Sequence, residues 1–91
     1  EAVQEMWRRE LGVDVRLLNQ ENKGLLEARR AGNFQILRSV WIADYVDPSS
    51  FLDIWRTDNG NNYTGWSSGA YDGLLFSAAR ATDPAARTAF Y

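Results

Sequence analysis

The sequence contains no cysteine and no histidine among its 91 residues. The absence of cysteine excludes disulfide bonds and thiol chemistry, and the two absences together remove the usual zinc ligands. They also exclude the Ser-His and Cys-His pairs that activate the nucleophile in many hydrolases. We therefore expect no catalytic residue, no metal site and no cofactor, and we expect that the protein is not an enzyme.

Dense positive charge and long apolar runs are missing as well. Ten Lys and Arg residues against twelve Asp and Glu residues give a formal net charge of −2, and no basic block is dense enough to follow a phosphate backbone. No apolar run approaches the roughly 20 residues of a membrane-spanning helix. We expect no nucleic-acid partner, and we interpret residues 1–91 as a single partial domain of a larger protein.

Apolar residues at helical spacing, with capping residues at the ends, predict five helical segments. They are residues 1–11 before Gly12, a segment from Asn19 to Gly32, one or two turns within 49–57, a helix through 71–78 capped by Ser67 or Ser68, and a last helix opened by Asp83 and Pro84. After the third of these segments, the polar and glycine-rich residues 57–69 predict a long surface loop.

Two segments have the pattern of β-strands. Residues 13–18 alternate apolar and charged side chains, whereas residues 34–43 carry apolar side chains on both faces, which is typical of a strand inside a parallel or mixed sheet. Strand, helix and strand in this order predict a βαβ unit with a right-handed crossover and flanking helices. The predicted fold class is therefore α/β.

Arg38 and Asp44 are the strongest candidates for a binding site. Arg38 is a cation among the apolar residues of the second predicted strand, and Asp44 follows the C-terminal end of that strand, where open α/β sheets place their ligand crevice. In one interpretation the two charges meet the two ends of a zwitterionic ligand. In the other, Arg38 is neutralised within the fold and Asp44 caps the turn before Pro48. Spacing alone favours the second interpretation.

The four tryptophans give an alternative function. Trp7 lies on the apolar stripe of the first helix and is expected in the core, whereas Trp41 fits a core or a pocket wall equally well. Trp55 and Trp66 flank the polar loop, where they could stack on sugar rings, so a carbohydrate-binding module using Trp41, Trp55 and Trp66 is the alternative. For Trp66 we favour packing against a part of the protein outside this chain.

Four consecutive stretches of the sequence also carry a resemblance to a known family. They are EAVQEMWRRELGVDVRLLNQE, ARRAGNFQILRSVWIADYVDPSSFLDIW, GNNYTGWSSGAYDGLL and ATDPAARTAFY, and WIADYVDPSSFLD is the most specific part. They resemble the C-terminal lobe of periplasmic oligopeptide-binding proteins, the family 5 extracellular solute-binding components of peptide ABC transporters. The resemblance implies a partial lobe of the type II periplasmic-binding-protein fold.

The same resemblance implies roles for individual residues. The aspartate of the family's W-x-x-D-Y motif, matched by Asp44, pairs with the α-ammonium group of an extended peptide bound between two lobes. The arginine six residues upstream, matched by Arg38, meets the carboxylate end of some peptides, and Trp41 is expected to line the cleft. We further expect Tyr45 and the turn at Asp47 to hold the Asp44 carboxylate in place.

The resemblance also implies partners and a location for the complete protein. The partners are an oligopeptide ligand, a second lobe and a membrane ABC permease, and the location is the periplasm or the cell surface, with a lipid anchor in Gram-positive bacteria. For the 91 residues alone, apolar surface intended for the rest of the protein predicts self-association.

Overall fold

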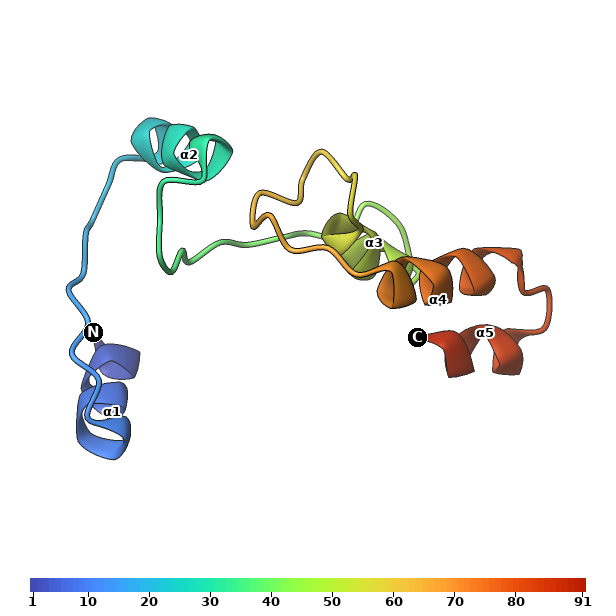
Figure 1. The fold of residues 1–91 in the computed structure, drawn as a ribbon, viewed down its shortest axis with the longest axis horizontal. Helices are drawn as coiled ribbons and strands as arrows, with labels where there is room; N and C mark the ends of the chain where they lie inside the picture. The colour runs from blue at the N-terminus through green and yellow to red at the C-terminus, as the bar shows by residue number, and fades with distance from the viewer.

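The computed structural model describes residues 1–91 as helices joined by extended segments (Figure 1). In chain order the elements are α1 (Ala2–Leu11), α2 (Asn22–Ala31), α3 (Ser49–Leu52), the 3₁₀ turn η1 (Asp53–Trp55), α4 (Gly69–Arg80) and α5 (Pro84–Phe90). None of the helices has the length and apolarity needed to cross a membrane.

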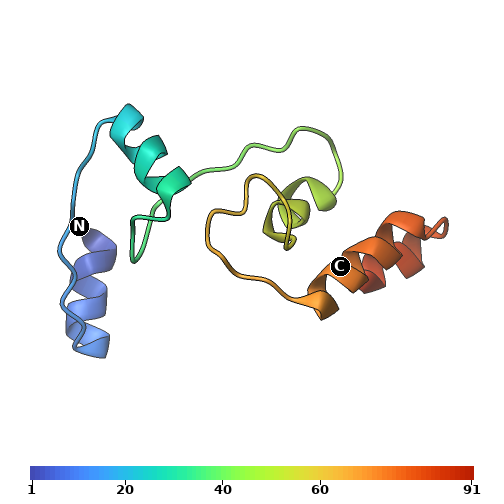
Figure 2. The same ribbon diagram turned by 45° about the horizontal axis from the view of Figure 1, so that its top comes forward.

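The chain has an open shape. Figures 1 and 2 show α1 and α2 at one end and α3, α4 and α5 at the other, joined by an extended connection. The Cα radius of gyration is 16.8 Å, against about 12 Å for a compact domain of this length. The accessible surface is 7601 Å², against about 5,400 Å² for a folded monomer of this mass. The 91 residues therefore do not enclose a core of ordinary size.

The predicted strands are wrong as secondary structure of this chain. Residues 14–20 and residues 34–44 make no hydrogen bond between backbone groups, and the two segments lie apart (Figures 1 and 2). A strand exists only through hydrogen bonds to a neighbouring strand, and within this chain neither segment has such a neighbour. The βαβ unit is consequently not formed by these residues.

The helix predictions are confirmed, with one shifted boundary. Gly12 and Gly32 end α1 and α2 in the left-handed conformation, with φ of 65° and 67°, which costs glycine no steric strain. The second helix begins at Asn22, so Asn19 is not its N-cap. Ser68, rather than Ser67, caps α4 by accepting a hydrogen bond from the Tyr71 N–H, and Asp83 caps α5 in the same way.

The small core lies in the C-terminal half. Helices α4 and α5 lie side by side after the chain reverses (Figures 1 and 2), and the two buried apolar residues, Leu75 and Ala78, are on α4. The Tyr71 hydroxyl donates a 2.8 Å hydrogen bond to the Leu52 carbonyl, which attaches α4 to α3. These contacts make α3, α4 and α5 one packed unit.

The predicted polar loop, residues 57–69, is held by side-chain hydrogen bonds. The Asn62 amide donates to the carbonyls of Trp55, Arg56 and Trp66, each at 3.0–3.1 Å. The Asp72 carboxylate accepts hydrogen bonds from the Thr57 backbone N–H and hydroxyl, and these bonds lower the pKa of Asp72. The start of the loop is therefore fastened to α4, and Asn62 joins the middle of the loop to η1 and to Trp66.

This open shape predicts how residues 1–91 behave when they are expressed alone. Ile36, Val40 and Ile42 have 69%, 78% and 84% of their surface exposed, and hydrophobic burial is the main stabilising contribution to folding. We expect the isolated chain to bind a hydrophobic dye, to melt without a cooperative transition by circular dichroism, and to self-associate in sedimentation. The complete protein is the control, and a sharply melting monomer of residues 1–91 would contradict this prediction.

Candidate functional site

The candidate site lies where the extended connection reaches α3. Ser50, on α3, is the one buried polar residue, with 4% of its surface exposed. Its hydroxyl accepts a 2.8 Å hydrogen bond from the Asp44 backbone N–H, and its carbonyl accepts a 2.7 Å hydrogen bond from the Trp41 indole N–H. The stretch from Trp41 to Asp44 is thereby attached to α3 at both of its ends.

The Asp44 carboxylate itself has no partner in the chain. Its side chain accepts no hydrogen bond and forms no ion pair, and the residue is exposed. The carboxylate therefore does not cap the following turn. The unpaired carboxylate on an anchored backbone leaves a negative charge available to any group that approaches it.

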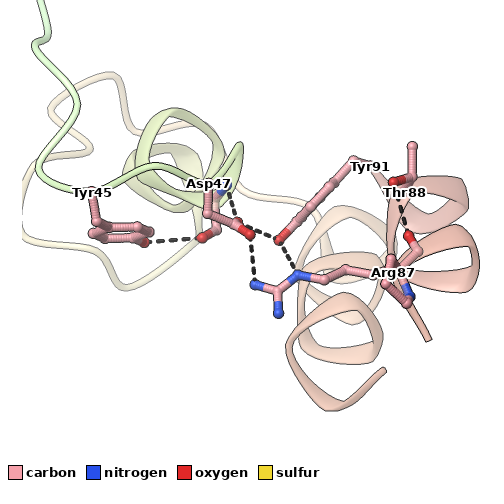
Figure 3. A network of polar contacts seen from close by, with 7 residues as sticks. Tyr45, Asp47, Arg87, Thr88 and Tyr91 are labelled. Atoms are coloured by element: carbon pink, nitrogen blue, oxygen red, sulfur yellow. Dashed lines mark hydrogen bonds and ion pairs between the residues drawn. The ribbon is translucent and has the colours of Figure 1, made fainter. Parts of the chain in front are cut away.

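Asp47, three residues later, has the opposite character (Figure 3). Its carboxylate accepts hydrogen bonds from the Ser49 backbone N–H at 2.9 Å and from the Tyr91 hydroxyl at 2.7 Å, and it pairs with Arg87 at 3.0 Å. Arg87 also donates to the Tyr91 hydroxyl at 3.1 Å. Both carboxylate oxygens of Asp47 are therefore occupied, and they connect α3 with the end of α5.

These contacts change the acidity of the groups that make them. The Tyr91 hydroxyl, followed by the hydrogen bonds from Ser49, holds the pKa of Asp47 well below its usual range. The hydrogen bond to Tyr91 raises the pKa of Arg87. Asp47 is therefore ionised at every pH at which the protein is expected to work.

Tyr45 lies differently from what the sequence predicts, and Arg38 does not fit the interpretation in which it is neutralised within the fold. The Tyr45 hydroxyl forms a 3.0 Å hydrogen bond with the Ser49 hydroxyl (Figure 3) rather than with Asp44. Arg38 is exposed and has no hydrogen bond or ion pair within the chain, so it is not neutralised by another residue of these 91. The backbone of Asp44 is fixed by Ser50, and Tyr45 takes no part in that contact.

A hollow of about 260 Å³ lies beside the extended connection. Its walls include Phe34, Leu37, Trp41, Trp55 and Tyr63. The Arg29 guanidinium, also at its wall, lies 4.9 Å from the centre of the Tyr63 ring, a cation–π contact. Of the four predicted site residues only Trp41 lines this hollow. Arg38, Asp44 and Tyr45 lie outside it.

The other tryptophans lie around the polar loop. Trp55, Trp66 and Tyr71 line a second, more open hollow, and the rings of Trp66 and Tyr71 meet edge to face with their centroids 5.1 Å apart. Trp41 and Trp55 share the first hollow. Trp55 therefore lines both hollows, with Trp41 beside it in the first and Trp66 in the second.

Sequence reasoning missed Ser50, Arg87 and Tyr91. Sequence reasoning did not find Ser50 because a serine near the start of a helix is ordinarily an N-cap, and the residues around it in the sequence do not predict that it is buried. Arg87 and Tyr91 stand four residues apart, which predicts that they meet on one helix face. Their common partner Asp47 is 44 residues before Tyr91, and no local pattern indicates a pairing over that distance.

Comparison with known proteins gives the class to which these features belong. Residues 1–63 match the family described as bacterial extracellular solute-binding proteins, family 5 Middle. The chain belongs to this family.

Curated relatives match almost all of the chain. It is 40% identical over 90 residues to the periplasmic murein peptide-binding protein of Escherichia coli, and 41% identical over 87 residues to the dipeptide-binding protein of Bacillus subtilis. Another relative, 41% identical over 90 residues, is named as a probable deoxycholate-binding periplasmic protein of Escherichia coli. These matches cover 96–99% of the chain but only 16–17% of each relative, so the chain spans about one sixth of their length.

Solved structures agree with the sequence relatives. The unliganded open form of the murein tripeptide-binding protein matches 99% of the chain with a TM-score of 0.95 and 40% identity. Haemophilus influenzae OppA in complex with RPPGFSPFR matches with a TM-score of 0.93 and 32% identity. In each case the chain covers 18% of the solved chain. The open path of the chain is thus the path that the same stretch follows inside larger periplasmic binding proteins.

The Asp47 network predicts a pH dependence that can be measured. A carboxylate whose pKa is lowered by folding stabilises the fold above its unfolded pKa of about 3.9, and that stabilisation is lost as the pH falls below this value. In the complete protein we expect the amide protons of α5 to be protected from exchange near pH 6 and to lose protection below about pH 4. Hydrogen exchange followed by NMR measures this.

Tyr91→Phe is the informative variant for the same network, because it removes only the hydroxyl that bonds to Asp47. The Asp47 carboxyl should then titrate at a higher pH, as followed by its ¹³C shift. Tyr63→Phe, whose hydroxyl makes no hydrogen bond in the chain, is the matched control and should leave the titration unchanged. An Asp47 that titrates like an unfolded aspartate in the unsubstituted protein would contradict the network.

Proposed function

We propose that the complete protein is the substrate-binding component of an ABC importer that binds oligopeptides, and that this chain supplies part of one wall of the binding cleft. The names of the relatives support a peptide ligand, since two of them are described by the peptides they bind and one solved relative holds RPPGFSPFR. Asp44 is the residue to which we assign recognition of the peptide's α-ammonium group.

The single observation that carries this assignment is the contrast between Asp44 and Asp47. The Asp47 carboxylate binds Ser49, Tyr91 and Arg87, whereas the Asp44 carboxylate has no partner although its backbone is hydrogen-bonded to Ser50. A free carboxylate on a fixed backbone suits an ammonium group, because a charge-assisted hydrogen bond is strongest when its acceptor is already in place.

The two extended segments, residues 13–18 and 34–43, have a place in the same proposal. The unpaired backbone groups of residues 14–18 and 34–43, all but the Val15 carbonyl and its bond to the Gln4 amide, and their apolar side chains suit strands that pair with neighbours in the rest of a lobe, which would complete the α/β fold that the sequence predicts. The high TM-scores against much longer proteins support this, since the segments keep the same path there. The second lobe of the cleft would close over the ligand from the other side.

The remaining site residues take secondary roles in the proposal. Arg38, exposed and unpaired, is available for the carboxylate end of a short peptide, and Trp41 forms the wall of the hollow beside the ligand. Tyr45, bonded to Ser49, shapes the turn after Asp44 without contacting its carboxylate. Main-chain pairing with an extended peptide would allow many different sequences to bind.

The proposal extends to where the protein works and with what. The relatives are named as periplasmic or extracellular proteins, so we assign the complete protein to the periplasm or the cell surface, with a lipid anchor if the cell lacks an outer membrane. A membrane ABC permease would receive the peptide from the closed cleft.

Asp44→Asn in the complete protein tests the assignment. The substitution keeps the shape of the side chain and removes the charge that meets the ammonium group. Removing one member of a buried charge pair costs about 2–5 kcal/mol, so we expect the dissociation constant of trialanine or RPPGFSPFR to rise about 30- to 4,000-fold in calorimetry.

Asp58→Asn is the matched control, because Asp58 is exposed on the polar loop and makes no hydrogen bond or ion pair. It should leave peptide affinity unchanged. Titration with deoxycholate and with oligosaccharides tests the other ligand classes, the second of which would use Trp41, Trp55 and Trp66. Tight binding of either ligand by a protein that ignores peptides would overturn the proposed function.

A further inference from the structure

Ser50 has the contacts of a residue that sets the geometry of the ammonium site. Besides accepting the Asp44 N–H and the Trp41 indole N–H, it donates its own backbone N–H to the Asp47 carbonyl at 3.0 Å. One buried residue therefore bonds to three members of the segment 41–47. The side-chain hydroxyl makes only one of these bonds, the bond to Asp44.

The bond from the Asp44 N–H to the Ser50 hydroxyl orients the backbone from which the Asp44 side chain projects. Apart from this bond, no backbone group of residues 34–44 makes a hydrogen bond, and the nearest backbone bond on the C-terminal side joins the Asp47 N–H to the Tyr45 carbonyl. The Ser50 hydroxyl is therefore the acceptor that fixes the peptide unit from which the Asp44 side chain projects. Without it, the segment from Trp41 to Asp44 would keep one hydrogen bond to α3, the bond from the Trp41 indole N–H to the Ser50 carbonyl.

From these contacts we propose that Ser50 is a positioning residue for peptide recognition. It does not touch the ligand, and it acts by holding the Asp44 carboxylate where the peptide ammonium arrives. The inference rests on the proposed function and adds a residue to it. It also explains why a hydroxyl is buried in a chain that buries only three residues, since a buried hydroxyl without a partner destabilises a protein.

The test uses a pair of variants that have the same shape. Thr and Val differ only in that Thr carries a hydroxyl where Val carries a methyl group, so Ser50→Thr and Ser50→Val in the complete protein share any cost of the added bulk. We expect Ser50→Val to bind RPPGFSPFR about 3- to 10-fold more weakly than Ser50→Thr, which is the value of one hydrogen bond. Ser77→Val is the control, because the half-buried Ser77 hydroxyl on α4 makes no hydrogen bond.

A general loss of folding is separated from a positioning role by two further measurements. The Thr and Val variants are compared again in an Asp44→Asn background and with RPPGFSPFR acetylated at its N-terminus. If Ser50 acts through Asp44, the difference between the variants falls to less than about twofold in both cases, because no charge pair remains to be positioned.

The outcomes also distinguish this inference from the proposed function. A large effect of Asp44→Asn together with equal affinities of Ser50→Thr and Ser50→Val would overturn the positioning role and keep the ammonium site. A difference between the two variants that is equally large for the acetylated peptide would also overturn it, since Ser50 would then support the fold alone. No effect of Asp44→Asn would remove the ammonium site itself.

Discussion

The C-terminal half of this chain depends on the ionised carboxylate of Asp47. Its two oxygens and its backbone carbonyl are each used, by Ser49, by the Tyr91–Arg87 pair and by the Ser50 N–H. The first turn of α3 is therefore fixed to the end of α5, although the two are far apart in sequence. Because α3 carries Ser50, both hydrogen bonds that hold the segment 41–44 go to the helix that Asp47 fixes.

Two aspartates three residues apart thus have complementary roles. Both carboxylate oxygens of Asp47 bind groups of the protein, and these hydrogen bonds lower its pKa. The Asp44 carboxylate makes no hydrogen bond, whereas the Asp44 backbone N–H donates one to the Ser50 hydroxyl. Rigid support beneath an unsatisfied charge is the arrangement that lowers the entropic cost of binding an oppositely charged group, which is the physical basis for assigning peptide ammonium recognition to Asp44.

The apolar segment 34–43 lacks partners within this chain for its backbone groups and for several of its apolar side chains. Residues 34–43 carry apolar side chains on both faces and leave their backbone groups unpaired. Both features are costly in water and are removed together when a strand enters a sheet. The agreement with solved periplasmic binding proteins at TM-scores of 0.93 and above places this stretch in a larger framework that can supply both kinds of partner.

The sequence by itself determined what depends on neighbours a few residues away. Helix positions, the left-handed Gly12 and the cap Asp83 follow from local spacing, and the resemblance to the W-x-x-D-Y pattern singled out Asp44 and Trp41. Only the tertiary structure decided that the segments expected as strands have no partner in this chain, that Tyr45 turns to Ser49, and that Ser50 holds Asp44. Hydrogen bonds between distant residues depend on how elements pack, and a local pattern contains no information about that packing.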